Sequence, residues 1–266
     1  MCDICGCGDV TGTVHHHQKD HNHEQPHTHD HQQPHTHDHE QSGTHDHENT
    51  GEAEISVGRD ILDINNKIAK RNRGFFKARN IFSVNIMSSP GSGKTTLLEK
   101  TLTDLKGKAG FYVIEGDQQT SMDADRIRAV DIPVLQVNTG SGCHLDASMI
   151  MRAVREFDPL PGSVVLIENV GNLICPSLFD LGEKARIVLM STTEGEDKPL
   201  KYPDMFRNAD LCIINKTDLL KYVSFNVEKA VENALKVNGR LQFLEVSALT
   251  GEGMEDWYKW LLANTG

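Results

Sequence analysis

A phosphate-binding loop is the first feature of this sequence that points to chemistry. Residues 88–95 read Ser-Ser-Pro-Gly-Ser-Gly-Lys-Thr and stand between a β-type run at residues 81–87 and an amphipathic helical pattern at residues 96–102. A strand, a glycine-rich turn and a helix in this order suit phosphate, because backbone N–H groups and the helix N-terminus face the anion. Ser88 stands where the first glycine of the usual pattern is expected. The alternative, a glycine-rich turn with a lysine present by chance, is disfavoured by the flanking strand and helix.

The side chains of this loop have expected roles in binding and hydrolysis. Lys94 is expected to reach the β- and γ-phosphates and to stabilise charge on the transferring phosphoryl group, which makes it a catalytic candidate. The hydroxyl of Thr95 is expected to ligate Mg2+. The residues predicted to bind the nucleotide phosphates are Gly91, Ser92, Gly93, Lys94, Thr95 and Thr96.

Two later segments predict which base is bound. Asn-Lys-Thr-Asp at residues 215–218 and Ser-Ala-Leu at residues 247–249 each follow a strand-like run. A carboxylate at Asp218 accepts hydrogen bonds from the N1–H and 2-amino groups of guanine, whereas adenine offers no such pair of donors. The sequence therefore predicts GTP rather than ATP. The expected base contacts are Asn215 at the far edge, Lys216 over the face, Asp218 at N1 and the 2-amino group, and Ser247 with Ala248 near O6.

Two acidic residues end strand-like runs and are the remaining catalytic candidates. Asp117 closes a Glu-Gly-Asp run and is expected to position Mg2+ or the attacking water. Glu168 stands three residues before Gly171, which matches the segment of GTPases that senses the γ-phosphate, although Asp is usual there. The longer side chain favours contact with Mg2+ through water. The alternative for each acid is an ordinary residue of a solvated loop. No arginine stands at a position that marks a built-in arginine finger.

Charge divides the chain into two parts. The 266 residues carry a formal net charge of −11, of which residues 1–54, with 11 acids and one lysine, contribute −10. Residues 55–266 are nearly neutral and long enough for one globular GTPase domain. No basic patch indicates nucleic acid, and no long apolar run or signal peptide indicates a membrane. We therefore expect a cytoplasmic protein whose six cysteines are thiols or metal ligands rather than disulfides.

A histidine-rich tract occupies the acidic part of the chain. Thirteen of the 14 histidines lie between His15 and His47, and Thr-His-Asp-His recurs three times with a period of eight residues. Neutral imidazoles bind Ni, Cu and Zn, and the scarcity of aliphatic residues predicts disorder. We expect residues 9–54 to be a disordered tail that holds several metal ions. The alternatives are an expression tag and a solvated linker with incidental histidines.

The first eight residues form a separate cysteine motif. Cys2, Cys5 and Cys7 lie close enough for three thiolates to bind one ion, with Gly6 between two of them and Gly8 after the last. A terminal amine or a backbone nitrogen can supply a fourth donor. Such a mixed set of nitrogen and sulfur donors permits Ni2+, and Zn2+ or Cu+ would also accept the thiolates. The competing interpretation, a Cys-x-x-Cys redox pair, is disfavoured because no βαβ pattern surrounds the motif.

A second metal site is predicted inside the folded domain. Cys143 and His144 stand in a glycine-containing loop, and Cys175 follows Gly171 by four residues. Two thiolates and an imidazole supply three ligands of a Zn2+ or Ni2+ site. Cys212 lies within a strand-like run and is interpreted as a small apolar residue of the core.

The order of these elements predicts an α/β fold. A largely parallel sheet flanked by helices is expected, because strand-like and helical patterns alternate and the motifs stand at strand ends. A helix before the first strand is expected from Val57, Ile61, Ile64 and Ile68. The strand-like runs are residues 81–87, 110–115, 133–137, 163–168, 186–191, 210–215 and 241–246.

Together these motifs resemble those of the HypB family, the hydrogenase nickel-incorporation GTPases. The resemblance rests on Met-Cys-x-x-Cys-Gly-Cys-Gly at the start and on segments at residues 88–96, 115–120, 137–146, 167–176 and 193–203. It implies a SIMIBI-class P-loop GTPase that forms a GTP-dependent homodimer. It also implies delivery of Ni2+ to the hydrogenase large subunit, together with a HypA-type nickel/zinc accessory protein.

The resemblance also assigns the metal sites. Cys2, Cys5 and Cys7 correspond to an N-terminal nickel site, and Cys143, His144 and Cys175 to a Zn2+ or Ni2+ site near the dimer interface. Histidine tracts are associated in this family with nickel storage. Two alternatives remain, namely a urease-type nickel-insertion GTPase and a nickel-buffering protein whose GTPase activity is incidental.

Overall fold

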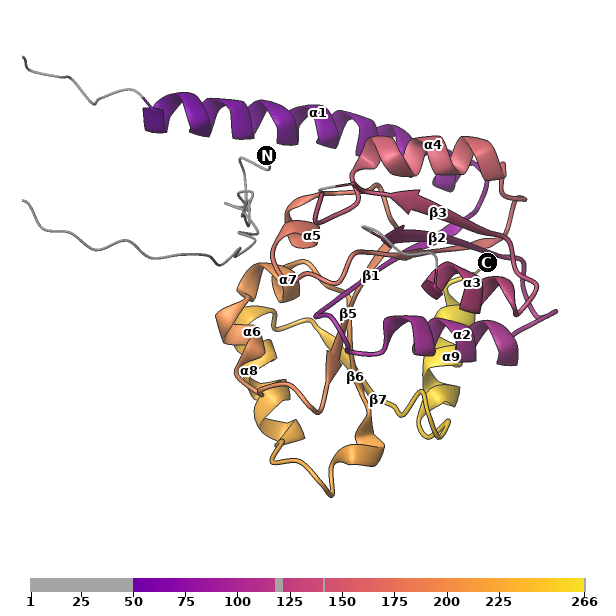
Figure 1. Ribbon diagram of the computed structural model, residues 1–266, viewed down its shortest axis with the longest axis vertical. Coiled ribbons are helices and arrows are strands. Elements are labelled where there is room, and N and C mark those ends of the chain that lie inside the picture. Colours follow the sequence, from indigo (N-terminus) through magenta and orange to yellow (C-terminus); the bar gives the residue numbers. More distant parts are fainter. Residues whose placement is uncertain (1–49, 118–121, 141, 266) are drawn as a thin grey trace, which may run out of the picture. The chain divides into compact units, whose positions relative to one another are not determined.

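The computed structural model describes residues 50–117, 122–140 and 142–265, so the predicted tail before residue 50, with Cys2, Cys5 and Cys7, lies outside the described residues. Residues from Gly58 onward form one compact unit. Strands and helices alternate along it (Figure 1). The strands are β1 Phe82–Ser88, β2 Phe111–Asp117, β3 Val134–Asn138, β4 Val164–Glu168, β5 Ala185–Ser191, β6 Leu211–Asn215 and β7 Gln242–Glu245.

Helix α1 precedes the first strand, α9 follows the last, and the other helices lie between successive strands. They are α1 Thr50–Ala78, α2 Lys94–Asp104, α3 Met122–Arg128, α4 Ala147–Phe157, α5 Cys175–Leu178, α6 Lys198–Lys201, α7 Pro203–Arg207, the 3-10 turn η1 Thr217–Leu219, α8 Val227–Val237 and α9 Met254–Ala263. The expected helix before β1 is present, and it begins at Thr50, upstream of the predicted domain start at residue 55. Glu and Ala, good helix formers, occupy residues 52–54. Within the described residues, no helix is both long and apolar enough to cross a membrane.

All the strands of the described sheet run parallel, in the order β3-β2-β4-β1-β5-β6-β7. Parallel pairing brings the carboxyl ends of the strands to one edge, which is where ligands bind in such sheets. The register sets Glu168 at the end of β4 beside Ile86 of β1 and beside Glu115 of β2. The predicted fold class is confirmed, because apolar strand runs separated by helices require this arrangement.

One face of the sheet is covered by α2 and α9. Leu97, Leu98 and Leu102 of α2 pack on alternate side chains of β1, and Trp257 of α9 is fully buried in the same cluster. The Trp257 indole Nε1 donates a hydrogen bond of 2.8 Å to the Thr101 hydroxyl, so the polar atom of this buried ring is satisfied. The helix that follows the phosphate loop is therefore held to the sheet by an extensive core.

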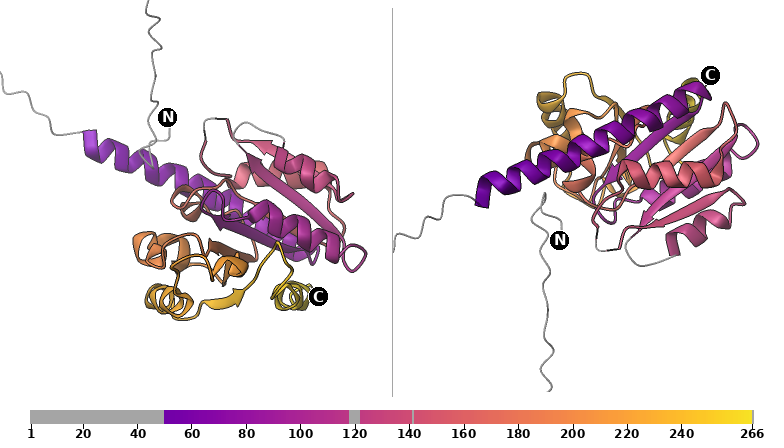
Figure 2. Two further views of the ribbon diagram at one scale, coloured as in Figure 1. Left: turned by 60° about the horizontal axis from the view of Figure 1, so that its bottom comes forward. Right: turned by 90° about the horizontal axis from the view of Figure 1, so that it is seen from above.

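The other face has two neighbouring clusters. Ile150 and Val154 of α4 pack with Phe76 of α1 against β2 and β4. Met205 and Phe206 of α7, together with α8, pack against β5 and β6. Helices thus cover both faces of the sheet (Figure 1, Figure 2).

Candidate functional site

The predicted phosphate-binding loop joins β1 to α2 and requires its glycines. Gly91 and Gly93 have φ values of 74° and 94°, a region that side chains other than glycine rarely adopt. A Cβ atom added to Gly93 would stand 2.7 Å from the Asn215 side-chain nitrogen. The loop therefore combines a left-handed backbone with close packing against the end of β6.

A cavity of about 610 Å³ opens over this loop at the carboxyl ends of the strands. Lys94 reaches back along the loop and donates a hydrogen bond of 2.7 Å to the Ser88 hydroxyl. Ser92 is 1% exposed and turns its hydroxyl away from solvent. Predicted site residues that line the cavity are Gly91, Gly93, Lys94, Thr95, Thr96, Asp117, Glu168 and Lys216.

The donors expected around Mg2+ meet at this cavity. The Thr95 hydroxyl donates a hydrogen bond of 2.8 Å to Glu168, and both side chains are buried. Asp117 lines the same cavity from the end of β2. Mg2+ prefers oxygen ligands such as hydroxyl, carboxylate and phosphate oxygens, so this donor set fits the ion. Glu115, 2% exposed and paired in register with Glu168, adds a second buried carboxyl group beside it.

The predicted guanine-binding residues gather at the ends of β6 and β7. The Ser247 hydroxyl donates a hydrogen bond of 2.6 Å to Asp218 Oδ1 and thereby orients the carboxylate. The Ser247 hydroxyl is fixed in turn, because it accepts the Thr250 N–H at 3.1 Å. Lys216 has a φ of 65°, which turns the chain sharply after β6. These contacts fix the orientation of the carboxylate that the sequence predicts to bind guanine.

Asn215 and Lys216 tie the predicted base-binding loops to the phosphate loop. Asn215 Nδ2 donates to the Ser92 carbonyl at 2.9 Å, and its Oδ1 accepts the Ala248 N–H at 3.1 Å. Lys216 Nζ donates to the Gly91 carbonyl at 2.7 Å. The Asn215 carboxamide, which we expected at the edge of the base, thus joins the loop after β6 to the phosphate loop and to the loop of Ala248. A base bound near Ala248 would share the Ala248 N–H with Asn215.

The sequence did not predict a role for Glu194, which forms hydrogen bonds to two serines of the phosphate loop. Its carboxylate accepts hydrogen bonds from the hydroxyls of Ser89 at 2.6 Å and Ser92 at 3.0 Å. Lys198 pairs with Glu194 at 3.1 Å and also donates to Ser89 at 3.0 Å. The available signal was positional, because Glu194 follows β5 at the same sheet edge as the predicted site.

Arg126 of α3 also lines the cavity, although its sequence position gave no indication of this. Its guanidinium donates to Glu99 at 2.6 Å and to the Thr96 hydroxyl at 3.3 Å. A cationic side chain therefore stands beside the start of α2. Only the tertiary fold brings α3 against α2.

The three residues predicted as the domain metal site come together in the structure. The ligand atoms of Cys143, His144 and Cys175 all lie within 4.8 Å of one another. The Cys143 sulfur lies 3.7 Å from His144 Nδ1, and Cys175 is 1% exposed at the start of α5. Two sulfurs and an imidazole nitrogen at this spacing fit the soft and borderline ions Zn2+ and Ni2+.

The surroundings of His144 favour a neutral imidazole. Its ring stacks on Phe179 with a centroid separation of 3.9 Å. Burial lowers the pKa of His144 below its usual value, and the nearby Asp146 carboxylate opposes this only in part. A neutral imidazole is the form that binds metals. Cys212, by contrast, lies inside β6, where burial raises the pKa of its thiol to about 12, as expected for an inert residue of the core.

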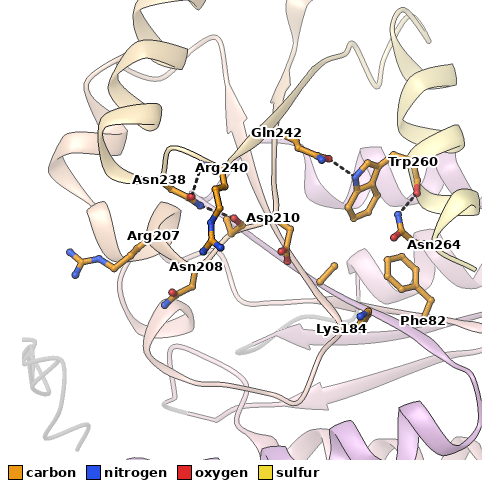
Figure 3. Close-up of a pocket in the computed structure, with 12 residues that line it drawn as sticks. Phe82, Lys184, Arg207, Asn208, Asp210, Asn238, Arg240, Gln242, Trp260 and Asn264 are labelled. Atoms are coloured by element: carbon orange, nitrogen blue, oxygen red, sulfur yellow. Dashed lines mark hydrogen bonds between the residues drawn. The ribbon is translucent and has the colours of Figure 1, made fainter.

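A second cavity, of about 550 Å³, lies at the opposite ends of the strands (Figure 3). It is lined by the first residues of β1, β5 and β7 and contains none of the predicted site residues. Several of its polar groups bond to one another, as Trp260 Nε1 does to Gln242 at 3.0 Å. Ligands of parallel sheets bind at the carboxyl ends, so the cavity over the phosphate loop is the nucleotide-site candidate.

Known protein families and solved structures include proteins similar to this chain. Residues 82–245 match the family described as "CobW/HypB/UreG, nucleotide-binding domain". A hydrogenase maturation factor HypB of Rhizobium leguminosarum bv. viciae is 57% identical over 210 residues, which are 79% of this chain and 70% of that relative. The chain belongs to the HypB family.

Other HypB relatives include a solved structure and a protein named for both hydrogenase and urease maturation. The crystal structure of HypB from Helicobacter pylori in complex with nickel is 40% identical with a TM-score of 0.71, and the match covers 76% of this chain and 94% of that one. A hydrogenase/urease maturation factor HypB of Helicobacter hepaticus is 44% identical over 190 residues, which are 69% of this chain and 78% of the relative. The suspected family membership is therefore confirmed.

Proposed function

We propose that this chain is a GTPase that uses nucleotide hydrolysis to control the transfer of Ni2+ to the large subunit of a [NiFe]-hydrogenase. The observation that carries the proposal is the position of two side chains in one short segment. Glu168 contacts Thr95 of the phosphate loop, and Cys175 belongs to the metal cluster. A segment with one end at the nucleotide and the other at the metal suits a protein that releases its cargo on hydrolysis.

In the proposed reaction, water attacks the γ-phosphate of GTP and the products are GDP and phosphate. Lys94 stabilises the charge that develops on the transferring phosphoryl group, and Asp117 or Glu168 orients the attacking water. Mg2+ held by Thr95 and the nearby carboxylates would neutralise phosphate charge. Asp218, fixed by Ser247, selects guanine.

Nickel is the cargo in this proposal. Cys143, His144 and Cys175 bind Ni2+ for transfer and also accept Zn2+. The histidine-rich residues 9–54 store nickel, and Cys2, Cys5 and Cys7 form an additional nickel site. We further propose a GTP-dependent homodimer, a HypA-type accessory protein as partner, and the cytoplasm as the place of action. The support for these assignments is membership of the HypB family together with the residues present.

Urease maturation is the second candidate destination for the nickel. The name of the Helicobacter hepaticus relative, which includes urease, favours keeping it. The two destinations use the same GTP and metal sites, so the acceptor protein distinguishes them. A nickel buffer with incidental GTPase activity is the third hypothesis, in which residues 15–47 carry the function.

The proposal is tested by transfer of nickel from the full-length protein to a metal-free hydrogenase large subunit. Transfer should require hydrolysable GTP and should be lost in Cys175→Ala. Cys212→Ala is the matched control, because that thiol is buried in β6. Removal of residues 15–47 should leave transfer intact when nickel is ample. Transfer by Cys175→Ala at the parent rate, or loss of transfer only on removal of the histidine tract, would contradict the proposal.

A further inference from the structure

We infer that Asn169 and Asn172 are positioning residues that carry the nucleotide state to the metal ligands, an inference that rests on the proposed function. Both lie in residues 168–172, between the end of β4 and α5. Each side chain holds the backbone of a different metal-ligand segment. Neither residue was anticipated from the sequence, because neither carries chemistry of its own.

The first step is the contact of this segment with the nucleotide site. Glu168 accepts the Thr95 hydroxyl at 2.8 Å. Val170 and Gly171 line the nucleotide cavity. A Cβ atom at Gly171 would lie 3.1 Å from Pro90 Cα, so the segment packs directly against the phosphate loop. A γ-phosphate in the cavity therefore acts first on residues 168–171.

The second step runs from Asn169 to the loop of Cys143 and His144. Asn169 Oδ1 accepts the Leu145 N–H at 3.1 Å, and Leu145 directly follows His144. The same oxygen accepts the Val170 N–H at 3.0 Å, so a single carboxamide joins the phosphate-sensing segment to the metal loop. Asn169 is 1% exposed and Leu145 is fully buried. A buried hydrogen bond of this kind is costly to break, so the two segments move together.

The orientation of the Asn169 side chain is fixed by a hydrogen bond to Asn85 of β1. Its Nδ2 donates to Asn85 Oδ1 at 3.2 Å, and Asn85 Nδ2 donates to Glu183 at 3.3 Å. Glu183 is held by the Arg186 guanidinium and by the Leu181 N–H at 2.8 Å. These contacts satisfy both polar atoms of the Asn169 carboxamide and oppose its rotation.

The third step runs from Asn172 to Cys175. Asn172 Oδ1 accepts the N–H groups of Ile174 at 2.8 Å and of Cys175 at 3.2 Å. The two asparagines therefore hold the two halves of the cluster from one five-residue segment. Metal–ligand distances tolerate only about 0.2 Å of deviation, so a small displacement of one half relative to the other changes metal affinity. By linkage, the metal alters nucleotide affinity by the same factor.

Asn65 supplies a matched control from the other side of the metal loop. Its Oδ1 accepts the Ala147 N–H at 2.9 Å, two residues beyond Leu145, and the side chain is 6% exposed. Asn65 belongs to α1 and does not line the nucleotide cavity. Truncation of Asn65 thus removes a comparable buried hydrogen bond to the same loop without cutting the connection to residues 168–172.

The experiment uses the full-length chain with Cys2, Cys5 and Cys7 replaced by alanine, so that thiolate-to-nickel charge-transfer absorption reports the domain cysteines. Ni2+ affinity is measured with GDP and with a non-hydrolysable GTP analogue. The parent should show a ratio of affinities within about 5–150, the usual range of allosteric coupling. Asn169→Ala should bring this ratio below about twofold, and Asn65→Ala should preserve it.

Asn172 keeps the test decisive if Asn169→Ala does not fold. Asn172→Ala, at a partly exposed position, should reduce the ratio, whereas Asn172→Asp keeps the acceptor oxygen and should restore it. The inference is overturned if Asn169→Ala or Asn172→Ala keeps the parent ratio, if Asn65→Ala loses it equally, or if the parent binds Ni2+ equally in both states. Absence of nickel binding or of GTP hydrolysis in the parent would instead refute the proposed function.

Discussion

Replacing Asp218 by asparagine should move the base preference from guanine towards xanthine. Asp218 lies in η1. Its Oδ1 accepts a hydrogen bond of 2.6 Å from the Ser247 hydroxyl, which orients the carboxylate. A guanine donates to this carboxylate from N1–H and from its 2-amino group. The asparagine amide presents an N–H group where the carboxylate accepted, so it opposes one donor with another. Xanthine carries an oxygen at position 2 and accepts the new donor.

The expected loss of GTP affinity follows from two hydrogen bonds to a charged acceptor. Each contributes about 1.5–3 kcal/mol net, and the lower value applies because Asp218 is half-buried. The pair then amounts to about 3 kcal/mol, or a hundredfold in the dissociation constant. Affinity for xanthosine triphosphate should rise in the same variant, and affinity for ATP should stay low.

Competition binding of GTP, ATP and xanthosine triphosphate checks this expectation. Ser247→Ala is the control, because it removes the hydroxyl that orients the carboxylate and keeps the carboxylate itself. It should weaken GTP binding by about 1 kcal/mol, which raises the dissociation constant roughly fivefold, without a new preference for xanthosine triphosphate. A variant Asp218→Asn that still selects GTP over xanthosine triphosphate would refute the assignment of this residue as the reader of guanine.

Three further substitutions, the last with a control, test other parts of the structure. Lys94→Ala should reduce phosphate release at least about a hundredfold while the full-length protein still binds nickel; unchanged hydrolysis would contradict the assignment of the loop. Glu194→Gln should weaken GTP binding about tenfold in equilibrium titrations, because the acceptor for both serine hydroxyls of the phosphate loop loses its charge. Trp257→Phe should lower the free energy of unfolding in urea by about 2 kcal/mol, since it removes the hydrogen bond to Thr101 and leaves a void. Trp260→Phe, at a more exposed ring, should cost less.

The fold was predictable because each strand is a short apolar run between turn signals. The run expected at residues 163–168 became β4 at Val164–Glu168, and the other strands agree similarly well. Parallel topology then places the motifs, because it brings the carboxyl ends of the strands to one edge. The metal cluster was predictable for a related reason, since cysteine and histidine beside glycine suggest ligands before any contact is known.

Residues that act by holding a backbone N–H or a hydroxyl of another segment were not predictable. Asn169 bonds to Leu145, Asn65 bonds to Ala147 and Glu194 bonds to Ser92, each across a long stretch of sequence. Asn169 and Glu194 lie in segments that carry the family resemblance, but asparagine and glutamate in loops ordinarily indicate turns and solvated surface, so the sequence assigned them no role. Their function depends on burial and on the N–H or hydroxyl group that the fold places opposite them, which only the three-dimensional structure supplies.

Ser88 shows how a departure from a motif becomes intelligible from its contacts. The position usually taken by the first glycine is here the last residue of β1, fully buried, with its hydroxyl donating to the Ser89 carbonyl at 2.6 Å. The same oxygen accepts Lys94 Nζ at 2.7 Å. A glycine would leave the strand geometry intact but would remove this acceptor, so the serine keeps the lysine folded over the loop before a nucleotide arrives. In the proposed function, phosphate oxygens would take over this acceptor role when a nucleotide binds.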